Sequence, residues 1–180
     1  PALMLLAAAL FSLMGVCVKW ATQWYSASEV VMYRGLVGAL ALAVLARTQG
    51  SSLRTTVPLM HLWRTSVGVL ALSLWFYAIG GLPLGTAITL NYTSSVWMAV
   101  FLMLGAWLGG RHERPDRQLV LTVFAGFVGV ALIPQPTLGA NQLTHGVAGL
   151  LSGFFSAFAY LQVATLSRAG EPEDRIVFYF

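Results

Sequence analysis

Charged side chains are scarce in this sequence, because only 9% of its 180 residues are Asp, Glu, Lys or Arg while 58% are hydrophobic. A soluble domain carries roughly 25% charged residues, so this chain lacks the polar side chains that would cover a water-facing surface. Apolar runs recur along it at about 20 residues, the length that one helix needs to cross a bilayer core. The alternating pattern of an outer-membrane barrel strand is missing. The sequence therefore predicts an all-α integral membrane protein.

Cysteine and catalytic motifs are missing too. The single cysteine, Cys17, lies inside the first apolar run, so neither a disulfide framework nor a zinc site is expected. The chain has no HExxH metal motif, no Walker phosphate loop and no GxSxG nucleophile elbow. The net charge of +4 does not indicate nucleic-acid binding, because the basic residues lie mostly in short loops between apolar runs. We expect neither an enzyme nor a cofactor, a metal or a nucleic-acid partner.

Six apolar spans and the start of a seventh fill the chain. Pro58 and Pro115 stand at or near helix starts, and "GGLPLG" separates the third span from the fourth. The predicted spans are residues 2–21, 29–46, 57–80, 84–108, 118–134 and 146–167, with the seventh opening at Arg175. The chain has no initiator Met and stops inside the seventh run, so we expect it to be part of a longer polypeptide.

Basic residues are distributed unevenly between the loops. The first, third and fifth loops contain no Lys or Arg. The second, fourth and sixth loops contain or adjoin Arg47, Arg54, Arg64, Arg111, Arg114, Arg117, Arg168 and Arg175. Because positive charge concentrates in cytoplasmic loops, this asymmetry predicts a multi-pass protein of the inner membrane with a cytoplasmic N-terminus. Of the ten basic residues, only Lys19 and Arg34 lie toward the outer side.

Two short segments recur in the same order. "FSLMGVCVKW" from Phe11 is similar to "FSAFAYLQVA" 144 residues later, and "EVVMYR" from Glu29 is similar to "RIVFYF" 146 residues later. Five spans separate the copies, and an odd number inserts the second copy upside down, as in many secondary transporters. We predict a first five-helix repeat at 1–135, a periplasmic linker at 136–145 and the start of a second, inverted repeat at 146–180.

Several segments resemble a known family. They are "MYRGLVGALAL" in the second span, residues 76–115, "FAGFVGVALIPQP" and the opening of the second copy at 149–160. On these, the whole chain resembles the EamA-type ten-helix members of the drug/metabolite transporter superfamily. Members often have a proline midway along the fourth helix, where this chain has Ser94 and Ser95. The resemblance implies a multi-span bundle of two inverted five-helix repeats around a central substrate cavity. It is closest to the YddG-like exporters of amino acids and related metabolites.

Transport needs a polar path through an apolar bundle, and helical spacing places polar residues on shared faces. Ser12 and Lys19 share a face of the first span, and Ser152 and Ser156 share one of the sixth. The predicted substrate-binding residues are Ser12, Lys19, Tyr77, Asn91, Trp97, Ser156 and Tyr160. Alternatives stay open at each position: a serine can bond its own helix, an aromatic ring can pack in the core, and Lys19 can extend to the lipid headgroups.

The ionisable residues near the second span are given structural roles. We expect Arg34 to bond helix-end carbonyls or to pair with Glu29, because a buried guanidinium with five donors needs several partners. Every other acidic residue lies in a cytoplasmic loop, so no proton carrier is predicted at membrane depth. His61, His112 and His145 are expected to be solvated.

Close helix packing is predicted at three pairs of small residues, which are Gly105 with Gly109, Ala125 with Gly129, and Gly149 with Gly153.

The leading hypothesis is a secondary transporter that exports amino acids or related small metabolites by alternating access. Its expected partners are that small-molecule substrate and the lipid bilayer, and a monomer is expected. A broader drug, nucleobase or nucleotide-sugar carrier of the same fold is the alternative within transport. A membrane scaffold or enzyme subunit without transport is the alternative from another class.

Overall fold

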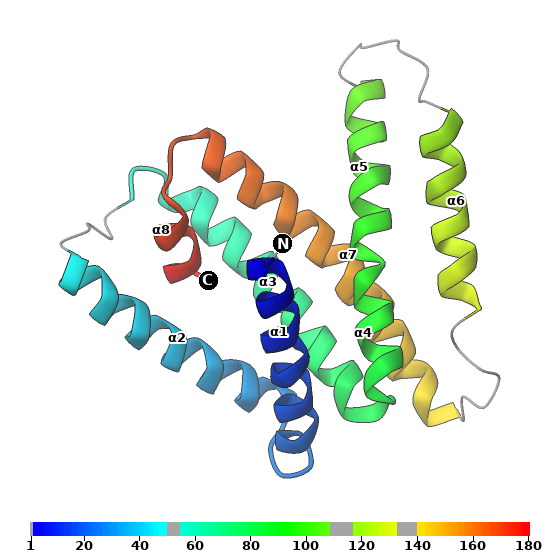
Figure 1. Cartoon of the computed structure of the whole chain (residues 1–180), viewed down its shortest axis with the longest axis horizontal. Coiled ribbons are helices and arrows are strands. Elements are labelled where there is room, and N and C mark those ends of the chain that lie inside the picture. The colour runs from blue at the N-terminus through cyan, green and yellow to red at the C-terminus, as the bar shows by residue number, and fades with distance from the viewer. Residues whose placement is uncertain (1, 50–54, 109–116, 133–139) are drawn as a thin grey trace.

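The computed structural model describes residues 2–49, 55–108, 117–132 and 140–180, and all structural statements below concern these residues. The described residues form helices joined by short turns, with no strand among them. The helices are α1 (Ala2–Ala21), α2 (Ala27–Gln49), α3 (Pro58–Gly81), α4 (Leu84–Tyr92), α5 (Ser94–Leu108), α6 (Arg117–Ala131), α7 (Ala140–Arg168) and α8 (Glu173–Phe178), as Figure 1 shows. The predicted all-α architecture is confirmed.

Five helical segments of the described chain are long and apolar enough to cross a membrane, with α4 and α5 as far as Gly105 counted as one. The described part of α6 has 15 residues, and α8 has 6. Two predicted bounds need correction. α2 runs from Ala27 to Gln49, longer than the predicted 29–46, and α7 begins at Ala140 instead of residue 146. Part of the predicted linker at 136–145 is therefore helical, while residues 136–139 lie outside the described residues.

α3 lies at the centre of the bundle and packs against α1, α2, α4 and α7 (Figure 1). Its buried side chains, led by Phe76 and Ile79, form the core together with Leu82, Ala87 and Leu90. By contrast, α1 and α2 expose leucines, valines and methionines along most of their length. A water-soluble monomer does not expose apolar surface on this scale, whereas lipid or further membrane helices cover it without penalty.

Two glycines bring α7 close to the α4–α5 region. A Cβ added at Gly149 would lie 2.9 Å from Leu90 Cδ1, and one at Gly153 would collide with Thr93 Oγ1 and lie 2.9 Å from the Leu90 carbonyl oxygen. The predicted close packing at Gly149 and Gly153 is confirmed. A Cβ at Gly105 or Gly129 would meet no atom of the described residues within 4 Å. The other two predicted pairs stay predictions, since Gly109 lies outside the described residues and no described neighbour packs against Gly129.

The predicted fourth span is broken without a proline. α4 ends at Tyr92, α5 begins at Ser94, and Thr93 between them is buried. The Thr93 amide donates to the Leu90 carbonyl at 3.2 Å, and its Oγ1 donates to the same oxygen at 2.7 Å. These bonds tighten the last turn of α4 and end the regular i→i−4 ladder there. Thr93, which lies against Gly153, marks this break, one residue before the Ser94–Ser95 pair that stands where the resembled family often has a proline.

The two copies of the repeated segment run in opposite directions. In Figure 1 α1 descends from the N-terminus while α7 ascends toward α8, and α8 packs against α2. This antiparallel arrangement is what an inverted second copy requires, and the division of the chain into two repeats stays a prediction.

Candidate functional site

A cavity of about 220 Å³ lies inside the bundle. Side chains from α1, α2, α3, α4 and α7, together with the residues after α8, surround it. They are Phe11, Met14, Arg34, Arg64, Gly68, Ala71, Leu72, Trp75, Asn91, Ser156, Ala159, Tyr160 and Phe180. A water molecule takes about 30 Å³ of liquid volume, so the cavity has room for a small metabolite. Aromatic and apolar walls with a few polar groups are typical of a small-molecule site.

One face of α3 forms the largest wall. Arg64, Gly68, Ala71 and Trp75 follow one another at steps of three or four residues, which places them in a row on one side of the helix. Gly68 lets the Phe180 ring approach, because a Cβ at Gly68 would lie 2.6 Å from Phe180 Cε2. The Thr65 hydroxyl, which donates to the Tyr179 carbonyl at 2.5 Å, fixes the backbone beside that ring.

Asn91 connects α4 to α7 at the edge of the cavity. Its Nδ2 donates to Ser152 Oγ at 3.0 Å and to Ser156 Oγ at 3.3 Å. Ser152 is fully buried, and its hydroxyl donates a hydrogen bond to the Gly149 carbonyl oxygen at 2.6 Å. Since both amide hydrogens of Asn91 point to serines, its carbonyl oxygen is left without a partner among the described residues.

Two guanidinium groups face the same aromatic ring. Arg64 Cζ lies 4.0 Å from the centroid of the Phe180 ring, and Arg34 Cζ lies 5.7 Å from it. Both distances fall within the range in which a cation is attracted to the face of an aromatic ring. The cavity therefore holds two positive charges that come from different helices.

Both of the predicted repeats contribute residues to the lining of this cavity. In the repeat of "EVVMYR" and "RIVFYF", Arg34 and Phe180 occupy equivalent positions, and they are the residues in contact. In the other repeat Ser12 is equivalent to Ser156, and the α1 residue next to it, Phe11, lines the cavity opposite α7. Equivalent residues touch only near a pseudo-two-fold axis, and transporters built from inverted repeats bind their substrates at that interface.

Three of the predicted substrate-binding residues, Asn91, Ser156 and Tyr160, line this cavity together. Lys19 does not. Its Nζ donates to the carbonyls of Ile79, Gly80 and Leu82, at 2.7, 3.0 and 2.8 Å. These oxygens end α3 and have no partner within that helix, so the lysine acts as a C-terminal cap. Its three N–H groups are all engaged within the chain.

The other three predicted residues also lie away from the cavity lining. Tyr77 is 45% exposed and stacks on His145 with ring centroids 4.3 Å apart. Trp97 packs edge-on against Phe154 in an aromatic cluster between α5 and α7. Ser12 is exposed on α1.

The expected contact between Glu29 and Arg34 does not form. Glu29 accepts hydrogen bonds from the Ser26 amide and the Ser26 hydroxyl, both at 2.8 Å, while the Glu29 amide donates back to Ser26 Oγ at 3.3 Å. This reciprocal pair is a capping box at the start of α2. Arg34 lies on the cavity against Phe180 instead of bonding helix-end carbonyls.

Arg64 is the residue that sequence analysis missed. It was grouped with the cytoplasmic loop arginines, but α3 begins at Pro58, so Arg64 lies almost two turns inside the helix. The available signal was its spacing from Gly68, Ala71 and Trp75 along one helical face. Arg34 lies at a similar depth in α2, and sequence analysis had singled it out for that reason.

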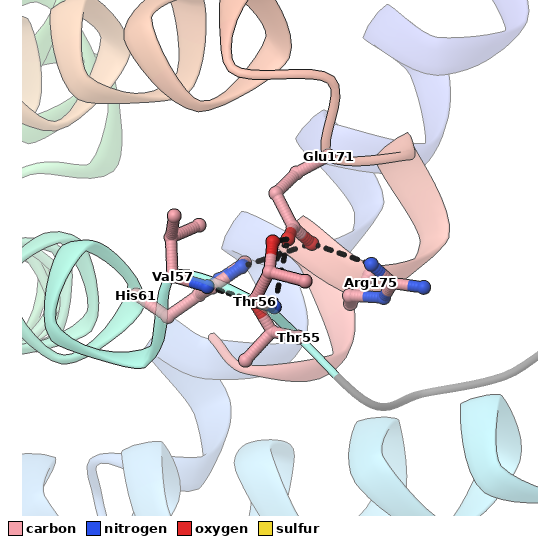
Figure 2. A network of polar contacts seen from close by, with 6 residues as sticks. All are labelled: Thr55, Thr56, Val57, His61, Glu171 and Arg175. Atoms are coloured by element: carbon pink, nitrogen blue, oxygen red, sulfur yellow. Dashed lines mark hydrogen bonds and ion pairs between the residues drawn. The ribbon is translucent and has the colours of Figure 1, made fainter.

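A second polar network joins the segment before α3 to the start of α8, and Figure 2 shows its members around Glu171. Glu171 accepts a hydrogen bond from Thr55 Oγ1 at 2.8 Å and one from Arg175 Nη1 at 2.9 Å. Thr56 contributes longer bonds, and His61 Nε2 lies 3.3 Å from Glu171 Oε2. His61 is only 1% exposed, so the expectation that it is solvated is wrong. His145 stacks on Tyr77, and His112 lies outside the described residues.

The hydrogen bonds to Glu171 determine its ionisation. Burial by itself would raise the pKa of this carboxyl, but the bonds from Thr55, Arg175, His61 and Thr56 lower it from 4.5 to about 2. The carboxylate is therefore charged throughout the physiological range. We call this set of contacts the Glu171 latch, because it ties the segment before α3 to α8. In the described ranges no group of three His, Cys, Asp or Glu residues could hold a metal ion.

The sequence profile of the EamA-like transporter family matches residues 2–135. The chain belongs to this family. EamA-like proteins are transporters and not enzymes, and the chain is accordingly a multi-pass membrane protein.

Curated relatives extend the match beyond residue 135. The chain is 36% identical over 179 residues to the pseudopaline exporter CntI of Pseudomonas aeruginosa, covering 99% of this chain and 61% of the exporter. It is 33% identical over 137 residues to a riboflavin transporter of Rhizobium johnstonii, covering 74% of this chain and 43% of that protein. An uncharacterized transporter of Helicobacter pylori is 27% identical over 167 residues, with coverages of 91% and 54%. The chain thus spans about 60% or less of each relative. No solved structure matches it.

Proposed function

We propose that this chain belongs to a secondary transporter of the bacterial inner membrane that exports amino acids or related small metabolites by alternating access. The observation that carries the proposal is the cavity of about 220 Å³, whose wall combines polar side chains of α2, α3 and α4 with those of α7. Asn91, Ser156 and Tyr160 contact the substrate, and Phe11 and Trp75 enclose its apolar part.

The character of the cavity favours an amino acid-like substrate. It presents cationic donors from Arg34 and Arg64 and an unpartnered carbonyl oxygen from Asn91, which suit a carboxylate and an ammonium group respectively. The exporter name of the Pseudomonas aeruginosa relative supports the outward direction. Tyr77, Trp97 and Ser12 stay predicted substrate contacts outside this cavity, whereas we assign Lys19 to capping the end of α3.

The riboflavin transporter from Rhizobium johnstonii favours a second candidate, a carrier of larger aromatic metabolites. The aromatic rings of Phe11, Trp75, Tyr160 and Phe180 would form stacking surfaces for such a substrate.

The test is transport by the complete protein in proteoliposomes. Labelled amino acids and labelled riboflavin are loaded inside, and their efflux is compared with that from protein-free liposomes. Faster efflux of at least one amino acid supports the proposal, and riboflavin efflux alone selects the second candidate. If neither class moves faster than in protein-free liposomes, the proposed function is wrong.

A further inference from the structure

The unpartnered polar atoms around the cavity are mainly hydrogen-bond donors. Trp75 lines the cavity, is only 8% exposed, and its Nε1–H has no acceptor among the described residues. Nε and Nη1 of Arg64 are likewise buried without an acceptor there. Leaving a buried donor without a partner is unfavourable, so this wall is suited to a ligand that supplies acceptor oxygens.

Charge points to the same kind of ligand. Neither Arg34 nor Arg64 has a carboxylate within ion-pair distance in the described part of the chain, where the ion pairs all involve Glu171. Two guanidinium groups beside one cavity repel each other, and the repulsion is stronger away from bulk water. An anion between them would relieve the repulsion and would gain from both charges.

The Phe180 ring holds the guanidinium groups without consuming their donors. A guanidinium over a ring interacts through its flat face, while its N–H groups point outward in its plane. Arg64, at 4.0 Å from the ring centroid, thus keeps its forked donors available for bidentate bonds to a carboxylate. Arg34, at 5.7 Å from the same centroid, can contribute a second pair of donors.

We infer that this cavity binds an amino acid-type substrate carrying a second carboxylate, with Arg34 and Arg64 as the groups that determine the preference. The inference rests on the proposed function and specifies its substrate class. The Asn91 carbonyl oxygen receives the ammonium group, and each carboxylate is bound by one guanidinium. Trp75 donates its indole N–H to the carboxylate next to Arg64.

Matched acid and amide probes test the inference. The complete protein, purified in detergent, is titrated calorimetrically with L-glutamate against L-glutamine and with L-aspartate against L-asparagine. Acid and amide have nearly the same shape and differ by one charge. A charge-assisted hydrogen bond is worth about 1.5 kcal/mol or more, so for at least one pair the acid should bind about tenfold tighter or better.

Variants then assign the preference to residues. Arg34→Gln and Arg64→Gln should each bring the acid-to-amide affinity ratio of that pair close to one. Arg64→Lys keeps the charge but loses the fork, so it should retain part of the ratio. Arg47→Gln is the matched control, because Arg47 is exposed in the last turn of α2 and does not line the cavity. It should leave the ratio unchanged. Arg34 is exposed at the cavity mouth, so its variant tests the inference even if Arg64→Gln fails to fold.

Three outcomes would overturn the inference. In the first, acid and amide bind equally in both pairs. In the second, the preference persists in Arg34→Gln and Arg64→Gln. In the third, inorganic phosphate displaces the acid at equal concentration, which would assign the site to phosphate. Each of these can occur while amino acid efflux from proteoliposomes is intact, so the inference can fail without the proposed function. Absence of efflux for every amino acid would contradict the proposed function itself.

Discussion

At the scale of single residues, the described chain uses its few ionisable side chains in distinct ways. Lys19 caps the end of α3, Glu29 caps the start of α2, and Arg34 with Arg64 borders the cavity. Sequence analysis marked Lys19 and Arg34 as basic residues away from the loops but grouped Arg64, which lies inside α3, with the loop arginines. It could not choose their partners, because the carbonyls that Lys19 meets are about 60 residues away along the chain. Such partners follow from tertiary packing alone.

Replacing Lys19 separates a capping role from a substrate role. Lys19→Met removes three charge-assisted hydrogen bonds to the end of α3 and should lower the free energy of unfolding by about 2 kcal/mol. Thermal unfolding of the complete protein in detergent measures this loss. Because Lys19 does not line the cavity, we expect the affinity for the transported substrate to stay within about twofold. A lost substrate contact would lower it about tenfold for each 1.4 kcal/mol. An unchanged Tm with a large loss of affinity would instead place Lys19 at the substrate.

At the scale of helices, close contacts at Gly149 and Gly153 determine how α7 packs against the junction of α4 and α5. The Gly-x-x-x-Gly spacing predicted the contact at Gly149 and Gly153, whereas at Gly105 no described residue comes within 4 Å of an added Cβ. Small residues permit close packing, whereas the neighbouring helix decides whether it occurs. The break at Thr93 was also beyond sequence analysis, since no proline marks it.

Alanine at two glycines tests this packing. Gly153→Ala should destabilise the protein by about 1–3 kcal/mol, because the added methyl overlaps Thr93 and the Leu90 carbonyl. Gly105→Ala places the methyl in open space and should be neutral or stabilising by up to about 1 kcal/mol through helix propensity. Thermal unfolding compares the two variants directly. If both variants change the free energy of unfolding equally, the α4–α5 break does not depend on the close approach of α7.

The Glu171 latch has a predictable pH dependence. The pKa of the Glu171 carboxyl falls from 4.5 to about 2 on folding, so the ionised carboxylate stabilises the folded state above about pH 4.5. This stabilisation is lost as the pH falls from 4.5 toward 2. Glu171→Gln should therefore lower the Tm at pH 7, and the gap to wild type should narrow below pH 4.5. Glu173→Gln is the control, because Glu173 is exposed in the same region. A gap that stays constant down to pH 3 would contradict this role.

At the scale of the whole molecule, the sequence was a good guide to the fold. Composition, span length and the inverted repeat predicted a multi-span helical bundle, and three predicted substrate contacts lie together in its cavity. The predicted bounds were too narrow at both ends of α2 and at the start of α7, because these helices extend beyond their apolar residues. Arg64 was missed because its neighbourhood in sequence looks like a loop boundary. Its role depends on α2, α7 and α8 approaching the same face of α3.

The orientation in the membrane is a prediction from the loop arginines. Single cysteines placed at residues 109–117, in a background where Cys17 is replaced by Ser, should react with a membrane-impermeant maleimide only in inside-out vesicles. Cysteines at residues 22–26 should react in intact spheroplasts. Reaction of the 109–117 loop from the periplasmic side would reverse the topology and the direction proposed for export.

Filling the cavity tests most directly whether it is the substrate path. Ser156→Phe places a ring in the cavity of about 220 Å³, while Ala164→Phe adds the same ring at an exposed position of the same helix, α7. The measurement is the initial rate of amino acid efflux from proteoliposomes that contain equal amounts of each folded variant. We predict that Ser156→Phe reduces efflux at least about tenfold while Ala164→Phe keeps the wild-type rate, since the ring occupies the volume that the substrate needs. Wild-type efflux by Ser156→Phe would show that substrate does not pass through this cavity.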